Sequence, residues 1–327
     1  MSKPVVKVQN LKRYFKQYKK EAGLKGTLKS LFKREHFDIK AVDDISFTIE
    51  KGEKVGFIGP NSAGKTTTLK MLSGILYPSD GIIEVLGYKP FKRKKEFLKK
   101  IGLVLGQRSQ LWWDLPAMEG FVLNKEIYEM NDKTFKTQVE YLSEMLDAKD
   151  ILDIPVRKLS LGQRMKCELL AALLHKPEVV FLDEPTIGLD IVVQKKIREF
   201  FLDLNKKHEN TILLTSHYMD DVQELCDRLI IINKGGLVFD GAIDNLIKEY
   251  ASHKNLKFIF NKKVLKKDLS QYGDVIDYDG AGFSATLSVD RKVHTKIAGD
   301  VLAKFPVDDL DVSEVSLEDI IGNIFKS

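Results

Sequence analysis

Cysteine and long apolar runs are the two features that this sequence most clearly lacks. Its only cysteines, Cys167 and Cys226, each lie in a stretch with helical periodicity, which argues against both a disulfide framework and a zinc site. No segment approaches the roughly 20 apolar residues of a membrane-spanning helix. Met1-Ser-Lys-Pro leads directly into strand-like residues 5–8, so we expect no signal peptide and a protein of the reducing cytoplasm.

The sequence also has little excess of either charge, with 52 lysines and arginines against 47 aspartates and glutamates. The formal net charge is +5 over 327 residues, of which 43% are hydrophobic and 30% charged. This excess is too small to predict a nucleic-acid partner by itself. The length is ample for one large α/β domain and a smaller second domain.

A glycine-rich loop follows the apolar run at residues 55–58. Gly59, Gly64, Lys65 and Thr66 fit the pattern G-x-x-x-x-G-K-[ST], which joins a strand to a helix and cradles phosphate. Small residues let successive backbone N–H groups turn toward an anion, and the following helix adds its positive end. We call residues 59–66 the phosphate loop; its inner members are Pro60, Asn61, Ser62 and Ala63, and Thr67 opens the helix beyond it.

Ser160 and Gln163 form a capping box, which predicts a second helix start suited to an anion.

Polar residues also follow three further strand-like segments. The apolar run 179–182 ends in Asp183, placed to hold Mg²⁺, and Glu184, placed to accept a proton from water. The strand-like residues 211–216 end at His217, and those at 101–106 end at Gln107. Gln107 is either a strand cap or a ligand for Mg²⁺ or the attacking water.

Two insertions interrupt this pattern. Residues 12–20 are basic and aromatic, and the chain from there to about residue 37 reads as an amphipathic helix or helix pair, which either packs on its own domain or lies against a membrane or membrane subunit. Residues from about 108 to 170 read as a helical subdomain, and Trp112 and Trp113 near its start either mark a contact surface or are buried by packing.

The composition shifts after Tyr250. Short strands and helices follow in the order β-α-β-β-α-β, which favours a small ferredoxin-like domain at residues 251–327. This part of the chain contains no constellation of catalytic residues. It is either a regulatory or dimer-supporting domain or a cap on the larger domain.

With these motifs in order, the chain resembles the nucleotide-binding subunit of ATP-binding cassette (ABC) transporters over residues 5–250. The resemblance implies an α/β P-loop ATPase fold with an inserted helical subdomain, and ATP and Mg²⁺ as cofactors. The motifs follow one another in the order typical of the family: the phosphate loop, Gln107, the signature Leu159-Ser-Leu-Gly-Gln163, Asp183 with Glu184, Gly188-Leu-Asp190 and His217. The resemblance implies Thr66, Gln107 and Asp183 as metal ligands, Glu184 as catalytic base, and Lys65 and His217 as contacts to the terminal phosphate.

Two departures from the family pattern are mild. Ser62 replaces a glycine of the phosphate loop, and Leu161 replaces a glycine of the signature, which leaves Ser160 and Gly162 to face the phosphate of a second copy. The resemblance also implies an aromatic residue that stacks on adenine. Counting from the first strand indicates Phe15, with Tyr14 and Tyr18 as competitors.

The basic insertion, placed at about 16–38, resembles that of bacterial exporters related to sodium- and drug-extrusion ATPases. This branch implies integral-membrane permease subunits as partners, a second copy of the chain facing the first, and a position at the cytoplasmic face of the cell membrane. No nucleic-acid partner is expected. The alternatives are a soluble ABC ATPase acting on a ribosome or nucleic acid, and an ATP sensor with little turnover, which would be expected to lack the Asp183-Glu184 pair.

Overall fold

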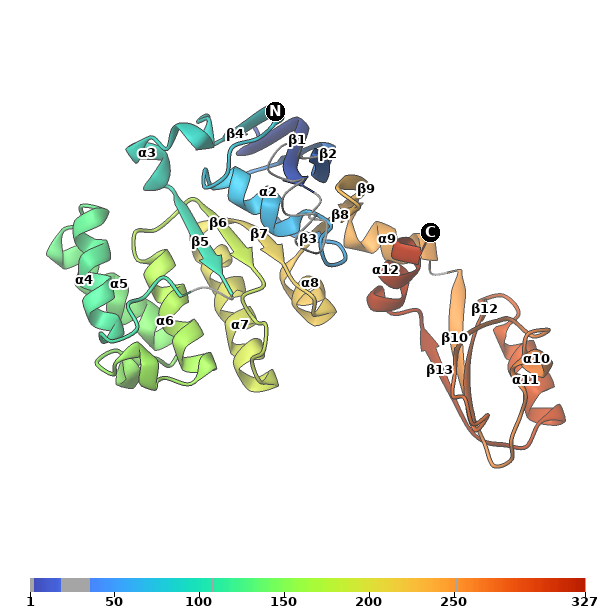
Figure 1. Cartoon of the computed structure of the whole chain (residues 1–327). Helices are drawn as coiled ribbons and strands as arrows, with labels where there is room; N and C mark the ends of the chain where they lie inside the picture. Colours follow the sequence, from blue (N-terminus) through green and yellow to red (C-terminus); the bar gives the residue numbers. More distant parts are fainter. Residues whose placement is uncertain (1–2, 19–35, 107–108, 251, 327) are drawn as a thin grey trace, which may run out of the picture. The chain divides into compact units, whose positions relative to one another are not determined.

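The computed structural model of the chain describes residues 3–18, 36–106, 109–250 and 252–326. These residues divide into a larger unit, Met1–Gly241, and a smaller unit, Ala242–Ser327 (Figure 1). The division comes somewhat earlier than the boundary after residue 250 that the composition predicts. Each unit has its own hydrophobic core.

The larger unit is built on a six-stranded sheet in the order β5-β6-β7-β3-β8-β9. The first five of these strands are parallel neighbours, and four are buried along almost their whole length, as expected for a parallel sheet between covering layers. The strands are β3 (Lys54–Ile58), β5 (Ile101–Leu105), β6 (Val179–Asp183), β7 (Thr211–Thr215), β8 (Arg228–Asn233) and β9 (Gly236–Ala242). All four strands ahead of predicted site residues, β3, β5, β6 and β7, therefore lie side by side.

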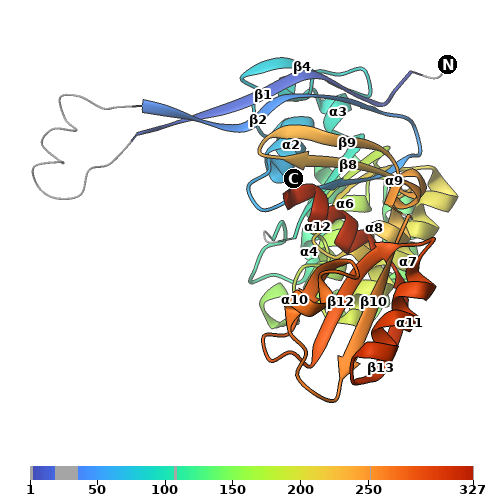
Figure 2. The same ribbon diagram turned by 90° about the vertical axis from the view of Figure 1, so that its right-hand side faces the viewer.

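A second, antiparallel sheet has the order β2-β1-β4, from β1 (Val6–Tyr18), β2 (His36–Ile49) and β4 (Asp80–Val85). Figure 2 shows β1 and β2 running on together past β4, which pairs with β1 only between Val6 and Lys12. The helix predicted to run to about residue 37 is therefore wrong at its end, where His36 and Phe37 belong to β2. Residues 19–35, which hold most of the predicted insertion, lie outside the described residues.

The physical reason is cross-strand pairing. Tyr14 faces Lys40 and Phe15 faces Ile39 across the β1–β2 pair, and aromatic and β-branched residues opposite one another stabilise strands. The partners are more than 20 residues apart, so a local helical period in the basic stretch does not reveal them. The basic segment before β5 contains two short helices, η1 (Pro90–Lys92) and α3 (Lys95–Leu98), which are separated at Arg93, whose φ is +47°.

Helices complete the larger unit. The helix after the phosphate loop is α2 (Lys65–Leu72), and the predicted helical subdomain contains α4 (Ala117–Ile127), α5 (Asp132–Met145), the short turns η2 (Lys149–Ile151) and η3 (Val156–Lys158), and α6 (Leu161–Leu173). Both α4 and α5 contact α6. After β6 and β7 come α7 (Ile191–His208) and α8 (Met219–Leu225). Among the described residues, none of the helices combines the length and apolarity needed to cross a bilayer.

The smaller unit contains α9 (Ile243–Tyr250), β10 (His253–Phe260), α10 (Lys266–Leu269), β11 (Asp274–Tyr278), β12 (Ser284–Asp290), α11 (His294–Lys304), β13 (Val307–Glu314) and α12 (Leu317–Lys326). Its sheet has the order β11-β12-β10-β13, with every neighbour antiparallel. This is the split β-α-β arrangement of ferredoxin-like domains, as predicted.

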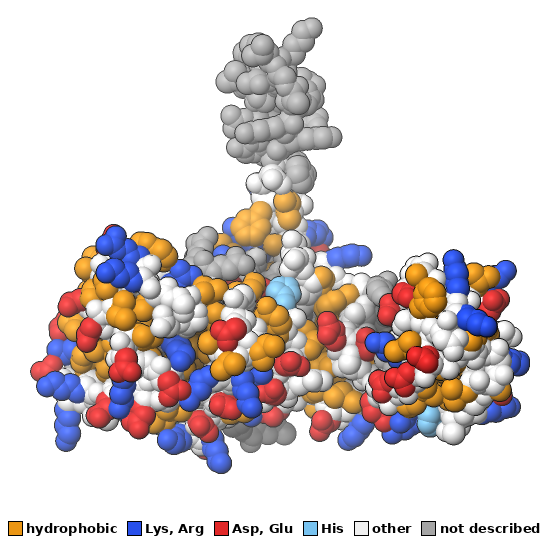
Figure 3. Space-filling model, turned by 90° about the horizontal axis from the view of Figure 1, so that it is seen from below, with side chains coloured by type: hydrophobic (Ala, Val, Ile, Leu, Met, Phe, Trp, Pro, Cys, Tyr) orange, Lys and Arg blue, Asp and Glu red, His pale blue; other side chains and the backbone are white. Residues whose placement is uncertain are grey.

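Figure 3 shows acidic, basic and apolar side chains interspersed on one face of each unit.

Candidate active site

The phosphate loop turns sharply between β3 and α2, and two glycines make the turn possible. A Cβ atom at Gly59 would lie 2.3 Å from the carbonyl oxygen of Ile232, and one at Gly64 would lie 2.4 Å from that of Ala41. Gly64 also has a φ of +108° and leaves the start of α2 without a side-chain cap. The first N–H groups of α2 are therefore available to an anion.

Ser62 occupies the position where the family resemblance implies a glycine. Its φ is +66°, in the left-handed region that glycine adopts without steric cost. The side chain is exposed, and so is that of Asn61. The serine is accommodated with backbone strain and without a clash in the core.

Lys65 is the buried cation of this loop, 6% exposed. Its Nζ donates hydrogen bonds to the carbonyl oxygens of Gly59 at 2.6 Å and Pro60 at 3.2 Å. Burial lowers the pKa of Lys65, and the charges of Glu184 and Asp183 partly oppose this shift. The ammonium group is thus bonded to the loop backbone and is stabilised by the charges of the two carboxylates.

Asp183 joins the phosphate loop to the end of β6. Thr66 Oγ1 lies 3.1 Å from Asp183 Oδ1, and Thr215 Oγ1 donates to the same oxygen at 2.8 Å. Asp183 and Thr215 are paired in register on the neighbouring strands β6 and β7. The sequence interpretation missed Thr215; its position at the end of a strand, level with Asp183, is the signal that could have found it.

Glu184 and His217 form a pair just beyond the ends of β6 and β7. His217 Nε2 lies 2.9 Å from Glu184 Oε1. The backbone N–H of Glu184 donates to the carbonyl oxygen of Thr215 at 3.0 Å and to its hydroxyl at 3.1 Å. The φ of Glu184 is +54°, so its side chain leaves the strand direction and turns toward His217.

The second predicted helix start is present. Ser160 caps α6: the N–H of Gln163 donates to Ser160 Oγ at 3.2 Å, and the N–H of Ser160 donates to Gln163 Oε1 at 2.9 Å. Gly162 is buried, and a Cβ atom there would lie 3.1 Å from Val193 of α7. No hydrogen bond or ion pair among the described residues joins Ser160 or Gln163 to the phosphate loop of the same chain.

The remaining predicted site residues are less fully placed. Phe15 is 36% exposed on β1, and the guanidinium of Arg13 lies 4.4 Å from its ring centroid. Tyr14 donates its hydroxyl hydrogen bond to Asp43, so its ring is held by its own unit. The side chain of Tyr18 and all of Gln107 lie outside the described residues.

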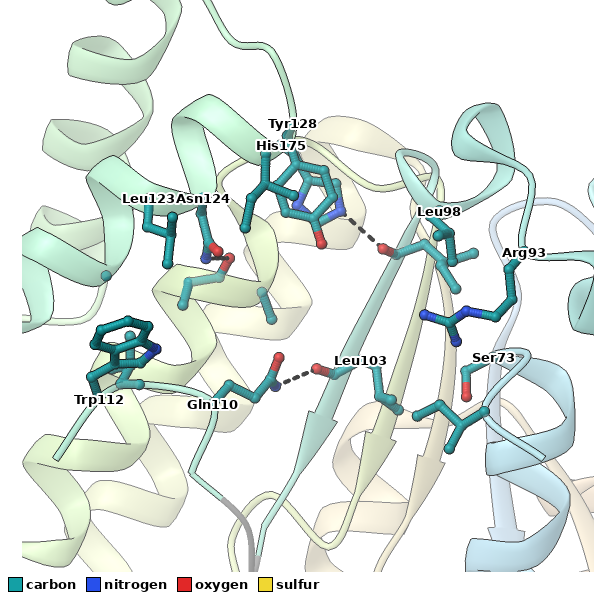
Figure 4. Close-up of a pocket in the computed structure, with 17 residues that line it drawn as sticks. Ser73, Arg93, Leu98, Leu103, Gln110, Trp112, Leu123, Asn124, Tyr128 and His175 are labelled. Atoms are coloured by element: carbon teal, nitrogen blue, oxygen red, sulfur yellow. Dashed lines mark hydrogen bonds between the residues drawn. The ribbon is translucent and has the colours of Figure 1, made fainter.

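A mostly apolar groove of about 390 Å³ lies between β5, the end of α2, and the helices α4 and α6 (Figure 4). Trp112 lines it and is 62% exposed, and Trp113 beside it is 51% exposed, so their burial by packing is excluded. The wall next to Trp112 is fixed by Glu168 of α6, 4% exposed. Its carboxylate accepts hydrogen bonds from Ser109 Oγ at 2.5 Å and from the N–H of Gln110 at 3.0 Å.

Comparison with known proteins matches both units to families of ABC transporter proteins. Residues 42–187 match the family model described as "ABC transporter", and residues 252–313 match "EvrA-like ABC transporter, C-terminal domain". The chain is 39% identical over 228 residues to the ABC transporter ATP-binding protein NatA of Bacillus subtilis, covering 70% of this chain and 92% of that protein. It is 34% identical over 243 residues to the bacitracin transport ATP-binding protein BcrA of Bacillus licheniformis, covering 73% and 77%.

A solved structure shares the fold. It is described as a dimeric, post-hydrolysis state of an ATP-binding cassette bound to ADP and Pi, and it superposes with a TM-score of 0.60 at 21% identity over 73% of this chain and 98% of that one. The phosphate loop, the paired carboxylates after β6 and the two family matches agree. The chain belongs to the family of ATP-binding subunits of ABC transporters and is an ATPase of that family.

Proposed function

We propose that this subunit powers export by hydrolysing ATP between two copies of the chain, at the cytoplasmic face of a membrane that holds separate permease subunits. The observation that carries the proposal is the meeting of four groups at one sheet edge. Thr66 Oγ1 lies 3.1 Å from Asp183 Oδ1, and His217 Nε2 lies 2.9 Å from Glu184 Oε1. These groups match the needs of water attack on a phosphate.

The donors fit Mg²⁺. Two oxygens on adjacent corners of an octahedron of 2.0–2.1 Å radius lie about 2.9 Å apart, close to the 3.1 Å between Thr66 and Asp183. Both donors are oxygens, the ligand type that Mg²⁺ takes. Bound Mg²⁺ supplies positive charge to the terminal phosphates. Thr66 and Asp183 would hold it, with Gln107 as the further ligand that the sequence indicates.

The chain's own residues have distinct tasks. Lys65 exchanges its bonds to the loop carbonyls for phosphate oxygens and stabilises their charge, together with the backbone N–H groups that the phosphate loop and Thr67 possess, Pro60 having none. Glu184 accepts the proton of the attacking water, and His217 orients Glu184 and contacts the γ-phosphate. In-line attack then needs no covalent intermediate on the protein.

Hydrolysis also needs the second copy. Ser160, Gly162 and Gln163 form an anion-ready helix start with no partner in the phosphate loop of their own chain. We infer that they complete the nucleotide site of a facing copy. Phe15, exposed on β1, is our choice for the side chain that stacks on adenine.

The groove beside Trp112 is our choice for the contact with the permease. Its lining is mostly apolar and includes Leu123 and Ile127, which are exposed on α4. An apolar surface of this kind on a single chain marks a protein contact. The names of relatives, such as the bacitracin transport protein, support export as the direction of transport.

Steady-state ATPase assays over a range of Mg²⁺ concentrations test the site. Thr66→Val removes one oxygen of the proposed ligand pair, and we expect the Mg²⁺ concentration for half-maximal activity to rise at least 10-fold. Asp203→Asn, at an exposed position of α7, is the control and should leave it unchanged. Equal Mg²⁺ dependence of Thr66→Val and the parent chain would contradict the ligand assignment.

The groove is tested separately in membranes. Ile127→Asp places a charge in the apolar groove without touching the nucleotide site. We expect the purified variant to hydrolyse ATP at the parental rate and to lose its recovery with the permease in detergent extracts of co-expressing cells. Retained recovery would move the permease contact to another surface.

A further inference from the structure

A buried carboxylate lies behind the Glu184–His217 pair. Asp221, in the first turn of α8, is 0% exposed, and both of its oxygens are occupied. Oδ2 accepts hydrogen bonds from Thr186 Oγ1 and, at 2.8 Å, from Ser216 Oγ. Oδ1 accepts from Nη1 of Arg198 at 3.0 Å.

The two hydroxyl donors belong to the two segments that carry the reacting pair. Thr186 follows Glu184 by two residues, and Ser216 directly precedes His217. Ser216 Oγ also accepts the N–H of Tyr218 at 3.0 Å, so the residues on both sides of His217 are tied to one hydroxyl group. Asp221 therefore connects the turn after β6 to the turn after β7.

Arg198 holds this carboxylate in place from α7. It is 5% exposed, and its Nε donates to Glu224 at 2.7 Å while its Nη1 donates to Asp221. A carboxylate with two hydroxyl donors and an arginine has little freedom to rotate. Its position, and with it the positions of both turns, is set by two helices of the larger unit.

Stability alone is a poor explanation for such an arrangement. A buried ion pair commonly contributes no more to stability than apolar residues of the same volume. A displacement of about 1 Å between reacting groups, however, can cost about 100-fold in rate. What a carboxylate offers here, and an apolar side chain does not, is simultaneous bonding to two separate turns.

We propose that Asp221 is a positioning residue for hydrolysis, which sets the distance between Glu184 and His217 through Thr186 and Ser216. The proposal rests on the roles proposed above for Glu184 and His217. Asp221 does not touch nucleotide. Its effect is confined to the geometry of the proton-accepting pair, because the phosphate loop lies on different elements.

The first test is the ATPase kinetics of Asp221→Asn, which keeps the size of the side chain and places an amide N–H₂ where one oxygen accepts. We expect kcat to fall about 10- to 100-fold and KM for ATP to stay within about 2-fold of the parental value. Combination with His217→Ala separates positioning from general destabilisation. If Asp221 acts through the pair, the combined loss falls well short of the product of the two single losses.

Matched variants complete the design. Glu224→Gln alters the other partner of Arg198 and leaves the bonds of Asp221 intact, so kcat should be unchanged. Thr186→Val removes the hydroxyl and keeps the shape, whereas Thr186→Ser keeps the hydroxyl; we expect loss of kcat in the first and near-parental kcat in the second. This pair decides the question even if Asp221→Asn fails to fold.

Three results would overturn the proposal: parental kcat in folded Asp221→Asn, full multiplicativity with His217→Ala, or equal kcat in Thr186→Val and Thr186→Ser. Failure of the proposed catalytic roles looks different, because Glu184→Gln and His217→Ala would then themselves retain parental kcat.

Discussion

Replacement of Glu184 by glutamine tests the catalytic assignment most directly. The change keeps the side chain's length and shape and removes its ability to accept a proton. The backbone N–H of Glu184 is held by both oxygens of Thr215, at 3.0 and 3.1 Å, so the side chain should keep its direction. A carboxamide can also keep a hydrogen bond to His217 across the present 2.9 Å.

The expected magnitude follows from the role. A positioned general base contributes about 10²- to 10⁴-fold to a rate, which equals roughly 3 to 5 kcal/mol of transition-state stabilisation at 1.36 kcal/mol per decade. ATP binding should persist, because Lys65 and the phosphate loop are unchanged. Glu184→Gln should therefore accumulate with ATP bound and with two copies closed on the nucleotide.

Light scattering with and without MgATP measures this state as a mass of twice the 37.2 kDa of one chain. Ser160→Arg is the matched second change, because it fills the helix start that would face the partner's phosphate. The double variant should stay monomeric. If Glu184→Gln hydrolysed ATP at the parental rate, the assignment of Glu184 as the base would be refuted. If Glu184→Gln stayed monomeric at saturating ATP, or if Ser160→Arg had no effect on a dimer that did form, the two-copy site would be refuted.

Three further changes probe the phosphate loop and the acid sensitivity of the fold. Lys65→Ala removes the buried ammonium, so titration calorimetry should show much weaker ATP binding and assays no hydrolysis, while circular dichroism remains parental. Ser62→Gly relieves a left-handed conformation that costs the folded state about 1–2 kcal/mol for a residue with a side chain. The glycine also raises the entropy of the unfolded chain, which destabilises the fold by about 0.5–1 kcal/mol. Thermal melting should therefore show an unchanged or slightly raised Tm, and a lowered Tm would contradict the strain at Ser62. Burial lowers the pKa of His175 to about 4 from 6.5, so its contribution of roughly 3 kcal/mol is present above pH 6.5 and is lost as pH falls toward 4. Urea unfolding across that range should show a weaker pH dependence in His175→Phe, and an unchanged slope would assign the sensitivity to other groups.

The sequence predicts which side chains come together where the residues concerned end strands. Lys65, Asp183 and His217 follow three separate apolar runs, and these runs become the adjacent parallel strands β3, β6 and β7. Parallel strands bring their carboxyl ends to one edge of the sheet. The positions of the three apolar runs therefore nearly suffice to predict that these side chains lie close together. The capping box of Ser160 and Gln163 is predictable for a simpler reason, since both partners lie within one helical turn.

The sequence is less informative where a contact depends on distant partners. The strand at residues 12–18 has its hydrogen-bonding partners at 36–43, and the local helical period of the basic stretch gives no hint of them. Asp221 meets Thr186 and Arg198 from 35 and 23 residues away. An aspartate in a polar, helix-forming stretch reads as a surface residue, and only the packing of α8 against α7 buries it.

Backbone conformation at Glu184 is the feature that sequence reasoning has least chance of finding. Glutamate rarely has a positive φ, and no residue type marks this position in advance as glycine would. The value of +54° brings its carbonyl oxygen to within 2.1 Å of where a Cβ atom of Gly106 would lie. The absence of a side chain at Gly106 is therefore what permits the turn.

Strain of about 1–3 kcal/mol at one residue persists only where the surrounding structure imposes it. Here, two hydrogen bonds do so: the N–H of Glu184 donates to Thr215, and the N–H of Gly106 donates to the carbonyl oxygen of Asp183. The same turn directs the Glu184 carboxylate away from the path of β6 and toward His217, so the strained residue is the one to which we assign proton transfer.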